Sequence, residues 1–187
     1  MRRLFITGIP TSGKSYLAKK LADEVGGIAV FLDDYREELT NDERYKKWVN
    51  LYLDKDEKSY LEKTDSDKQW ANLVAQSEAL WPAFLEKINS FSIEANPVIF
   101  ECVNLLPHLM QKQNFSGLVL IGDSYENVLK RNTEYPRWGE TRQLQELEAM
   151  TFFNVERPRY TSEAKKYGYP IFETADQAHT KGLELLK

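Results

Sequence analysis

The stretch LFITGIPTSGKSYLAKKL, residues 4–21, changes from one sequence pattern to another at a turn that contains two glycines. Residues 3–7 are mostly apolar and end in β-branched side chains, which favours a short buried strand that stops at Gly8. Residues 14–25 repeat apolar side chains four positions apart, and a glycine pair follows them at 26–27. That pattern predicts a helix and its end. The stretch therefore predicts a strand, a turn and a helix in succession.

The turn, GIPTSGKS, fits the pattern G-x-x-x-x-G-K-[ST] at every defined position. Its glycines allow successive backbone N–H groups to converge on an anion, and the start of the following helix adds N–H donors and partial positive charge. Lys14 supplies a cation for the β- and γ-phosphates, and the Ser15 hydroxyl is a ligand for Mg²⁺. The segment predicts a site for a nucleoside triphosphate, with ATP and Mg²⁺ as the expected cofactors. The expected phosphate-binding residues are Gly8, Ile9, Pro10, Thr11, Ser12, Gly13, Lys14 and Ser15.

Short apolar runs alternate with helical patterns along the rest of the chain. The further strands are expected at 28–32, 97–101, 117–121 and 169–174, and the further helices at 41–53, 66–90, 124–132, 140–166 and 176–186. This alternation indicates an open parallel sheet. The predicted fold is α/β, a three-layer α/β/α P-loop NTPase with a five-stranded parallel sheet. A single domain, residues 1–187, is expected, with a helical acceptor-side insertion at about 36–92 and a lid at about 131–160.

Composition excludes several classes of protein. The chain has one cysteine, Cys102, and two histidines, which excludes an intrachain disulfide and leaves little material for a zinc site. No apolar run approaches the roughly 18 residues that cross a bilayer. We therefore expect a cytoplasmic protein with no membrane partner, and the composition leaves its oligomeric state open.

Charge is distributed unevenly along the chain. Residues 33–67 contain twelve Asp and Glu against seven Lys and Arg, whereas residues 130–166 contain eight Lys and Arg against six Asp and Glu. A long polyanion such as a nucleic acid needs Lys and Arg along its backbone, so the acidic segment disfavours it as an acceptor. A small alcohol, a nucleoside-like ring or a cationic metabolite fits the segment better.

A second motif, FLDDYREEL, occupies residues 31–39, directly after the second expected strand. Ligands of such folds bind at the carboxyl edge of the sheet, where this motif would lie. Asp33 or Asp34 could accept a proton from an attacking hydroxyl or order Mg²⁺-bound water. Arg36, one helical turn further on, could hold the acceptor or a phosphoryl oxygen. The alternative is a helix N-cap with a solvated acidic first turn.

Three arginines recur around the segment TEYPRWGET, residues 133–141. Arg131, Arg137 and Arg142 would lie on or beside a segment between helices that contains proline and glycine. Such a segment can close on transferring phosphates and exclude water, and the guanidinium group suits bidentate contacts with phosphate oxygens. The alternative is that they are surface arginines paired with neighbouring glutamates.

The two motifs, GIPTSGKS and LDDYRE, together resemble those of the P-loop kinases of the adenylate-kinase-like fold. They are most similar to the pairing in polynucleotide 5′-hydroxyl kinases and related small-molecule kinases. The resemblance implies that Lys14 and Ser15 serve phosphate and metal, that Asp33 is the general base and that Arg36 orients the acceptor. The segment VLKRN, residues 128–132, resembles the helix that leads into the lid of these enzymes, which implies that Arg131 is a basic residue near that lid.

The segment VIFECVNLLP, residues 98–107, resembles the third strand of uridine-kinase-like and 2-phosphoglycerate-kinase-like enzymes. In those enzymes an acidic residue ends the strand, beside the acceptor or magnesium. The resemblance implies that position for Glu101, and the expected metal residues are Ser15, Asp33 and Glu101.

These observations predict an ATP-dependent kinase that transfers the γ-phosphoryl group to a hydroxyl of a small-molecule acceptor. The expected catalytic residues are Lys14, Asp33, Arg36, Arg131 and Arg137, and Arg142 is expected to bind the nucleotide. One alternative is a polynucleotide 5′-hydroxyl kinase, which the DDYR and LKRN segments favour and the acidic insertion opposes. The other is a non-catalytic ATP-binding regulatory or interaction protein. A GTPase is disfavoured because the chain has no N-K-x-D segment for reading guanine.

Overall fold

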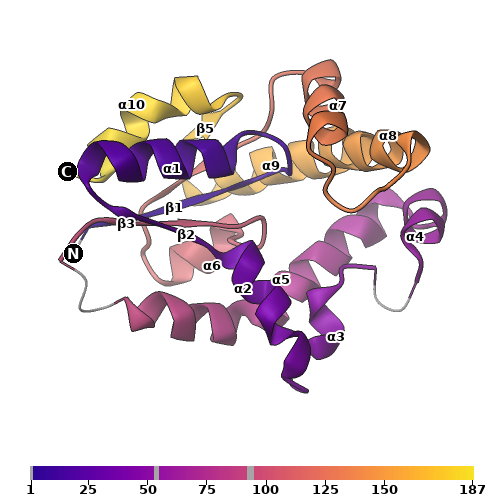
Figure 1. Ribbon diagram of the computed structural model, residues 1–187, viewed down its shortest axis with the longest axis horizontal. Coiled ribbons are helices and arrows are strands. Elements are labelled where there is room, and N and C mark those ends of the chain that lie inside the picture. The colour runs from indigo at the N-terminus through magenta and orange to yellow at the C-terminus, as the bar shows by residue number, and fades with distance from the viewer. Residues whose placement is uncertain (1, 53–54, 92–94) are drawn as a thin grey trace.

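A parallel β-sheet of five strands forms the centre of the computed structural model, which describes residues 2–52, 55–91 and 95–187 (Figure 1). The strands lie in the order β2-β3-β1-β4-β5, and each neighbouring pair is parallel. Their bounds are β1 Arg3–Gly8, β2 Ile28–Phe31, β3 Val98–Glu101, β4 Gly117–Leu120 and β5 Ile171–Phe172. The expected five-stranded parallel sheet is confirmed, and β5 is shorter than the run predicted at 169–174.

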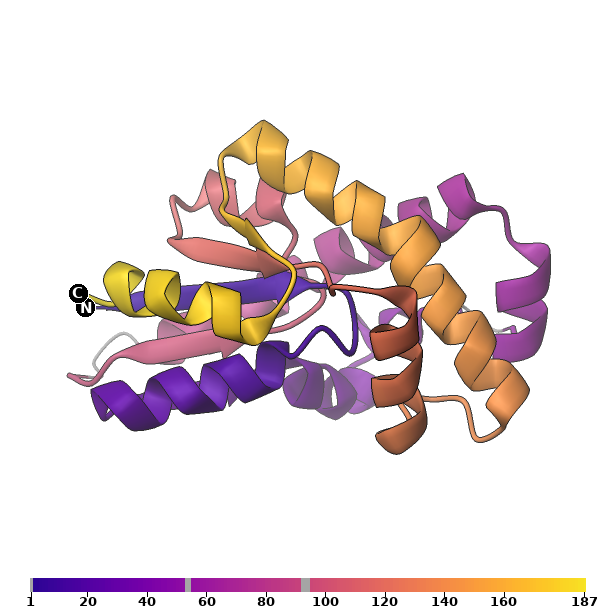
Figure 2. The same ribbon diagram turned by 90° about the horizontal axis from the view of Figure 1, so that it is seen from above.

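Helices connect the strands and cover both faces of the sheet. The α-helices are α1 Lys14–Val25, α2 Leu32–Glu38, α3 Lys46–Val49, α4 Glu57–Lys63, α5 Ser66–Ser90, α6 Pro107–Lys112, α7 Tyr125–Glu134, α8 Arg142–Met150, α9 Arg157–Tyr167 and α10 Ala175–Leu185. A 3-10 turn, η1 Leu39–Asn41, follows α2, and a π-helix, η2 Thr151–Glu156, joins α8 to α9. Figure 2 shows α8, η2 and α9 as one continuous rod. In the described ranges, every helix is too short or too polar to cross a bilayer.

Two apolar cores lie on opposite faces of the sheet because side chains alternate along each buried strand. Leu4 and Ile6 of β1 pack with α1 and α10, which lie together on one face (Figure 1). Phe5, between them in sequence, points to the other face and stacks on Phe100 and Phe115, with ring centroids 5.2 and 4.1 Å away. Helices α5, α6 and α9 cover that face. The predicted three-layer arrangement is confirmed.

The helix predicted at 41–53 is wrong for most of its length. Among its described residues the structure has the end of η1 and the single turn α3, and residue 53 lies outside the described residues. Local side-chain bonds compete with a helix here, since Asp42 accepts from the backbone N–H of Arg44 and Asn50 accepts from that of Tyr52. The aromatic side chains that suggested a helical repeat instead pack against the core from separate turns.

Two helices that the sequence analysis did not predict have clear local causes. Asp56 begins α4, where its side chain accepts a hydrogen bond from the backbone N–H of Ser59. Pro107 occupies the first position of α6, where its missing N–H costs no helical hydrogen bond. His108, the next residue, also lies in α6. The helices predicted at 66–90 and 140–166 are confirmed, the latter with η2 inside it.

A substitution at Gly8 tests the junction between β1 and the turn. Gly8 has φ of 125°, and a Cβ atom there would overlap the backbone carbonyl of Leu120 on β4. We expect Gly8→Ala to lower the free energy of unfolding by about 3 kcal/mol or more in chemical denaturation. Gly26→Ala is the matched control, because Gly26 has φ of 62° but open space around it, and it should cost about 1 kcal/mol. Equal losses would show that backbone strain, and not the approach of β4, fixes Gly8.

Candidate active site

The turn between β1 and α1 folds back on itself around the carbonyl oxygen of Ile9. The Nζ atom of Lys14 donates to that oxygen at 2.7 Å, and the Ser12 hydroxyl donates to it at 2.8 Å. Gly13 and Thr11 have positive φ values of 95° and 58°. Thr11 is a non-glycine residue in a left-handed conformation, a form of strain that proteins concentrate at functional loops. The loop geometry therefore agrees with the anion-binding cradle that the motif predicts.

Glu101 lies beside this loop because of the order of the strands. It ends β3, in register with Ile6 of β1 on one side and Phe31 of β2 on the other. Its carboxylate accepts from the Ser15 hydroxyl at 2.9 Å, and its Oε1 atom is 3.8 Å from the Nζ atom of Lys14. Sequence analysis expected Glu101 near the phosphate loop, and the structure places it there.

Burial shifts the pKa values of both charged partners toward their neutral forms. Loss of solvent raises the pKa of Glu101 and lowers that of Lys14. Each group opposes the shift of the other, and the negative charge of Asp33 adds to the rise at Glu101. The charged forms of Lys14 and Glu101 are thus stabilised chiefly by each other.

The donors near the loop suit magnesium. Ser15, Glu101 and Asp33 offer hydroxyl and carboxylate oxygens, the ligands that Mg²⁺ prefers, and Mg²⁺ takes few of them because it keeps water and substrate phosphates as its other ligands. The described part of the chain contains no group of three or more His, Cys, Asp and Glu side chains placed to hold a metal ion. These residues fit a magnesium ion that arrives with a nucleotide.

Asp33 and Arg36 face each other on α2, which begins directly after β2. The Arg36 guanidinium is buried, and its Nη1 atom lies 3.0 Å from Oδ1 of Asp33 and 3.0 Å from Oδ1 of Asn104. The thiol of Cys102 donates to the same Asp33 oxygen at 3.4 Å, and burial raises the pKa of that thiol well above its usual value. Asp34 is exposed. The structure therefore orients Asp33, and not Asp34, by specific partners.

The three arginines of the expected lid lie in different places. Arg131 donates to the Thr11 carbonyl oxygen at 3.3 Å. Arg137 lines both the cavity over the phosphate loop and a smaller depression beside Asp33. Arg142 donates to Thr133 at 2.7 Å and pairs with a glutamate one helical turn away, and it lines a separate surface depression. The structure brings Arg131 and Arg137 to the phosphate loop and does not bring Arg142 there.

A cavity of about 790 Å³ opens over the phosphate loop. The start of α10 forms part of its wall, through Thr174, Ala175 and Asp176. The other lining residues are Thr11, Ser12, Gly13, Lys14, Ser15, Tyr16, Lys19, Arg131, Tyr135, Pro136 and Arg137. The cavity is large enough for a nucleotide and has the phosphate loop at its floor.

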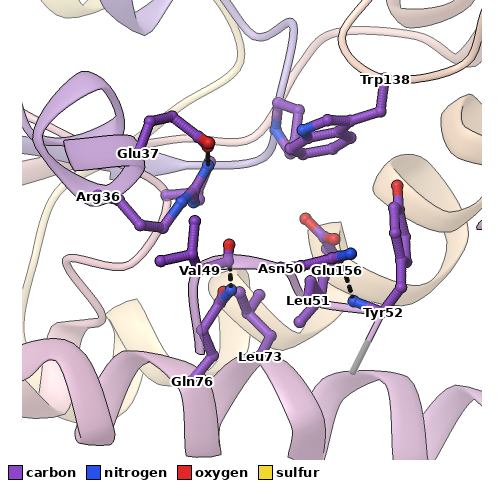
Figure 3. A pocket seen from close by; sticks show the side chains of 12 residues that line it. Arg36, Glu37, Val49, Asn50, Leu51, Tyr52, Leu73, Gln76, Trp138 and Glu156 are labelled. Carbon is purple, nitrogen blue, oxygen red and sulfur yellow. Dashed lines mark hydrogen bonds and ion pairs between the residues drawn. The ribbon is translucent and has the colours of Figure 1, made fainter. Parts of the chain in front are cut away.

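A second cavity, of about 270 Å³, lies on the other side of Arg36, toward the helical insertion. Figure 3 shows Arg36 and Glu37 on one side of it, Tyr52 on the other, and Glu156 between them. Trp138 covers it from the loop between α7 and α8. The sequence analysis did not identify Tyr52, Trp138 or Glu156 as site residues.

Glu156 is the last residue of the π-helix η2, in the middle of the rod formed by α8, η2 and α9. Pro158 lies two residues further on and has no backbone N–H for a helical hydrogen bond. π-Helical turns are frequent at functional sites, and a proline inside the predicted helix 140–166 was the sequence signal that could have marked one.

Glu148 fixes the loop that carries Arg137 and Trp138. Its Oε1 atom accepts from the backbone N–H groups of Trp138 and Gly139, at 3.3 and 3.1 Å. Its Oε2 atom accepts from the Asn132 side chain of α7 at 2.8 Å. One buried carboxylate therefore joins the loop to α7 and α8, so that the Arg137–Trp138 segment reaches both cavities from a supported position.

No family model and no curated protein sequence matches this chain. Solved structures do resemble it over nearly its whole length. Shikimate kinase from Bacteroides thetaiotaomicron has a TM-score of 0.55 and 15% identity, over 99% of this chain and 98% of that one. Shikimate kinase from Acinetobacter baumannii in complex with shikimate has 0.54 and 13%, over 99% and 92%. Deoxyadenosine kinase from M. mycoides with bound dATP has 0.50 and 14%, over 99% and 96%.

At such low identity the likeness concerns the fold, which is that of the P-loop kinases. The adenylate-kinase-like fold implied by the GIPTSGKS and LDDYRE motifs is confirmed. The roles of the individual residues remain predictions.

The titration of Glu156 gives a test of its burial. Burial raises its pKa from 4.5 to about 7, so between these values the folded chain binds a proton that the unfolded chain has released. The contribution of Glu156 to the free energy of unfolding is therefore fully present below pH 4.5 and is lost as the pH rises through about 7. Relative to wild type, we expect Glu156→Gln to gain up to roughly 3 kcal/mol in unfolding free energy between about pH 4 and about pH 8.

Chemical denaturation at several pH values measures this difference. Glu134→Gln, which removes an exposed carboxylate from α7, is the control for the loss of one negative charge. A difference between Glu156→Gln and wild type that does not change with pH would contradict the burial of an ionisable Glu156.

Proposed function

We propose that this protein is a cytoplasmic ATP-dependent kinase that transfers the γ-phosphoryl group to a hydroxyl of a small-molecule acceptor. The observation that carries the proposal is the position of Asp33. Asp33 lines a small depression between the two cavities. Arg137 lines both this depression and the cavity over the phosphate loop, and Arg36 and Trp138 line both the depression and the second cavity. A base between a nucleotide site and an acceptor site is the arrangement that phosphoryl transfer requires.

The nucleotide would bind with its phosphates in the loop from Gly8 to Ser15. The backbone N–H groups of the loop, the N-terminus of α1 and Lys14 would bind the phosphate oxygens. Ser15 would hold Mg²⁺, with Asp33 and Glu101 close to it, and the ion would neutralise charge on the β- and γ-phosphates. The wall beside the adenine ring would be formed by Thr174, Ala175 and Asp176.

Asp33 would align the acceptor hydroxyl and accept its proton. Arg36 and Cys102 both bind Oδ1 of this carboxylate, so Oδ2 is the oxygen placed to receive the proton. Arg36 acts here as a positioning residue as much as an acceptor contact, because its guanidinium is already engaged. Arg131 and Arg137 would stabilise the charge that spreads over the γ-phosphoryl oxygens during transfer.

The size and charge of the second cavity support a small acceptor over a polynucleotide. A volume of about 270 Å³ suits a single small molecule. Two carboxylates, Glu37 and Glu156, line the cavity, and its arginine is paired with Asp33. A nucleic-acid backbone would need free cations along its path.

A transfer assay with radiolabelled ATP tests the proposal across nucleosides, sugars, amino sugars, phosphorylated acids and oligonucleotides. We expect Lys14→Ala to lower transfer to any accepted substrate by about 100-fold or more, since it removes the buried cation from the phosphate loop. Lys165→Ala, at the exposed end of α9, is the control and should leave transfer near the wild-type rate. Equal rates for wild type and Lys14→Ala would refute a kinase that uses this loop.

The neighbouring aspartates separate a kinase from a non-catalytic ATP-binding protein. Asp33→Asn removes the proposed base and should lower kcat by about 100-fold or more, with ATP binding retained in calorimetry. Asp34→Asn changes an exposed carboxylate on the same helical turn and should keep most of the activity. If the wild-type protein binds ATP but phosphorylates no acceptor in the panel, the regulatory alternative is favoured. A larger loss in Asp34→Asn than in Asp33→Asn would reassign the base.

A further inference from the structure

The second cavity contains a buried carboxylate oxygen without a partner. Glu156 is 6% exposed, and no residue in the described ranges hydrogen-bonds its Oε2 atom. The same carboxylate lines the cavity (Figure 3). Burying such a group without a partner is costly, whereas a bound ligand that donates to it would recover that cost. The cavity therefore lacks a hydrogen-bond donor, or a cation, at the position of Glu156.

The charges around the cavity favour a cation. Arg36 is the cationic side chain among the lining residues, and it is paired with Asp33 and lies 3.5 Å from Glu37. Behind the wall, the Tyr52 hydroxyl donates to Glu57 at 3.1 Å. Burial and the neighbouring Glu148 raise the pKa of Glu57 to about 7. When Glu156 is ionised, the described lining therefore has two carboxylates, Glu37 and Glu156, against one guanidinium group.

Two aromatic rings stand beside Glu156. Tyr52 and Trp138 meet nearly edge to face, with ring centroids 6.2 Å apart and planes at 83°. Both line the cavity, and Trp138 is 41% exposed. The faces of aromatic rings attract ammonium groups, and Trp does so most strongly. An aromatic corner next to an unpaired carboxylate is the chemistry that recognises an amine.

We propose that the acceptor is a small amino alcohol, whose ammonium group pairs with the carboxylate of Glu156 beside Tyr52 and Trp138 while its hydroxyl reaches Asp33. This inference rests on the proposed kinase function and names the substrate class of the same site. Burial raises the pKa of Glu156 to about 7, and a bound ammonium group would stabilise its ionised form.

The step balances without any further reactant. The acceptor oxygen forms a bond to the γ-phosphorus of ATP, and the bond from that phosphorus to the β–γ bridging oxygen breaks. The hydroxyl proton passes to Asp33, and ADP leaves with the electron pair of the broken bond. The ammonium group takes no part in the chemistry and remains bound to Glu156.

Two matched series of compounds test the proposal with the wild-type protein. Glucosamine, glucose and glucuronate share one pyranose scaffold with a cationic, neutral or anionic group, and serinol, glycerol and glycerate form a second, three-carbon series. We expect kcat/KM for the amine to exceed that for its neutral partner by about tenfold or more in at least one series, and the acid to be the poorest substrate. The proposal is overturned if neither amine is phosphorylated, or if in both series the neutral or anionic partner is used as well as the amine.

A variant pair assigns the preference to Glu156. Glu156→Gln should lower the ratio of kcat/KM for the amine to that for its neutral partner by about tenfold. Glu134→Gln, which removes a carboxylate outside the cavity, should leave that ratio unchanged. An equal loss for amine and neutral partner would reflect general damage to the cavity and would overturn the role of Glu156. If Glu156→Gln does not fold, the wild-type series still decides the substrate class.

Failure of this inference is distinguishable from failure of the proposed function. Lys14-dependent transfer to nucleosides or other uncharged acceptors, with no preference for amines, leaves a kinase and removes the amino alcohol. Absence of transfer to any acceptor removes both.

Discussion

The ammonium group of Lys14 is buried, and the surrounding structure is arranged to compensate for its lost solvation. A backbone carbonyl holds it at 2.7 Å, and the Glu101 carboxylate lies 3.8 Å away. The first contact requires the loop to curl over Ile9, which depends on a glycine where β1 meets β4. The second requires β3 to lie next to β1 in a register that ends both strands at the same edge. A buried cation is stable only with such partners. The burial of Lys14 therefore constrains both the order of the strands and the geometry of the site.

The parts of the fold that follow from local chemistry could be predicted from the sequence. The strand from Arg3, the helix from Lys14 and the long helix α5 have strong periodicity and clear ends, and the structure has them within a residue or two of their predicted bounds. Glu101 could be placed beside the loop because, in the fold that the motifs resemble, the third strand of the chain lies next to the first. The structure of segment 41–53 could not be predicted in this way, because hydrogen bonds from the backbone to the side chains of Asp42 and Asn50 outweigh the helical spacing of its apolar residues.

The candidate site was less accessible to sequence reasoning, because it depends on contacts between distant segments. Spacing alone groups the three arginines of the 131–142 region, yet the pairing of α7 with α8 turns Arg142 toward Thr133 and away from the phosphate loop. Glu156 resembles any helical glutamate in the sequence. Its burial follows from the π-helical turn and from α5 packing against it. The position of Trp138 likewise depends on a hydrogen bond from its backbone N–H to Glu148, ten residues away.

Arg137 and Trp138 are adjacent in one short loop, yet the first lines the cavity over the phosphate loop and the second lines the cavity that contains Glu156. A peptide unit joins them, so a shift of the loop that moves the guanidinium also moves the indole. A ligand in one cavity that shifts this loop would therefore change the shape of the other. Energetic linkage of this kind is reciprocal: two ligands that share the dipeptide as a common wall must each alter the affinity of the other to the same degree.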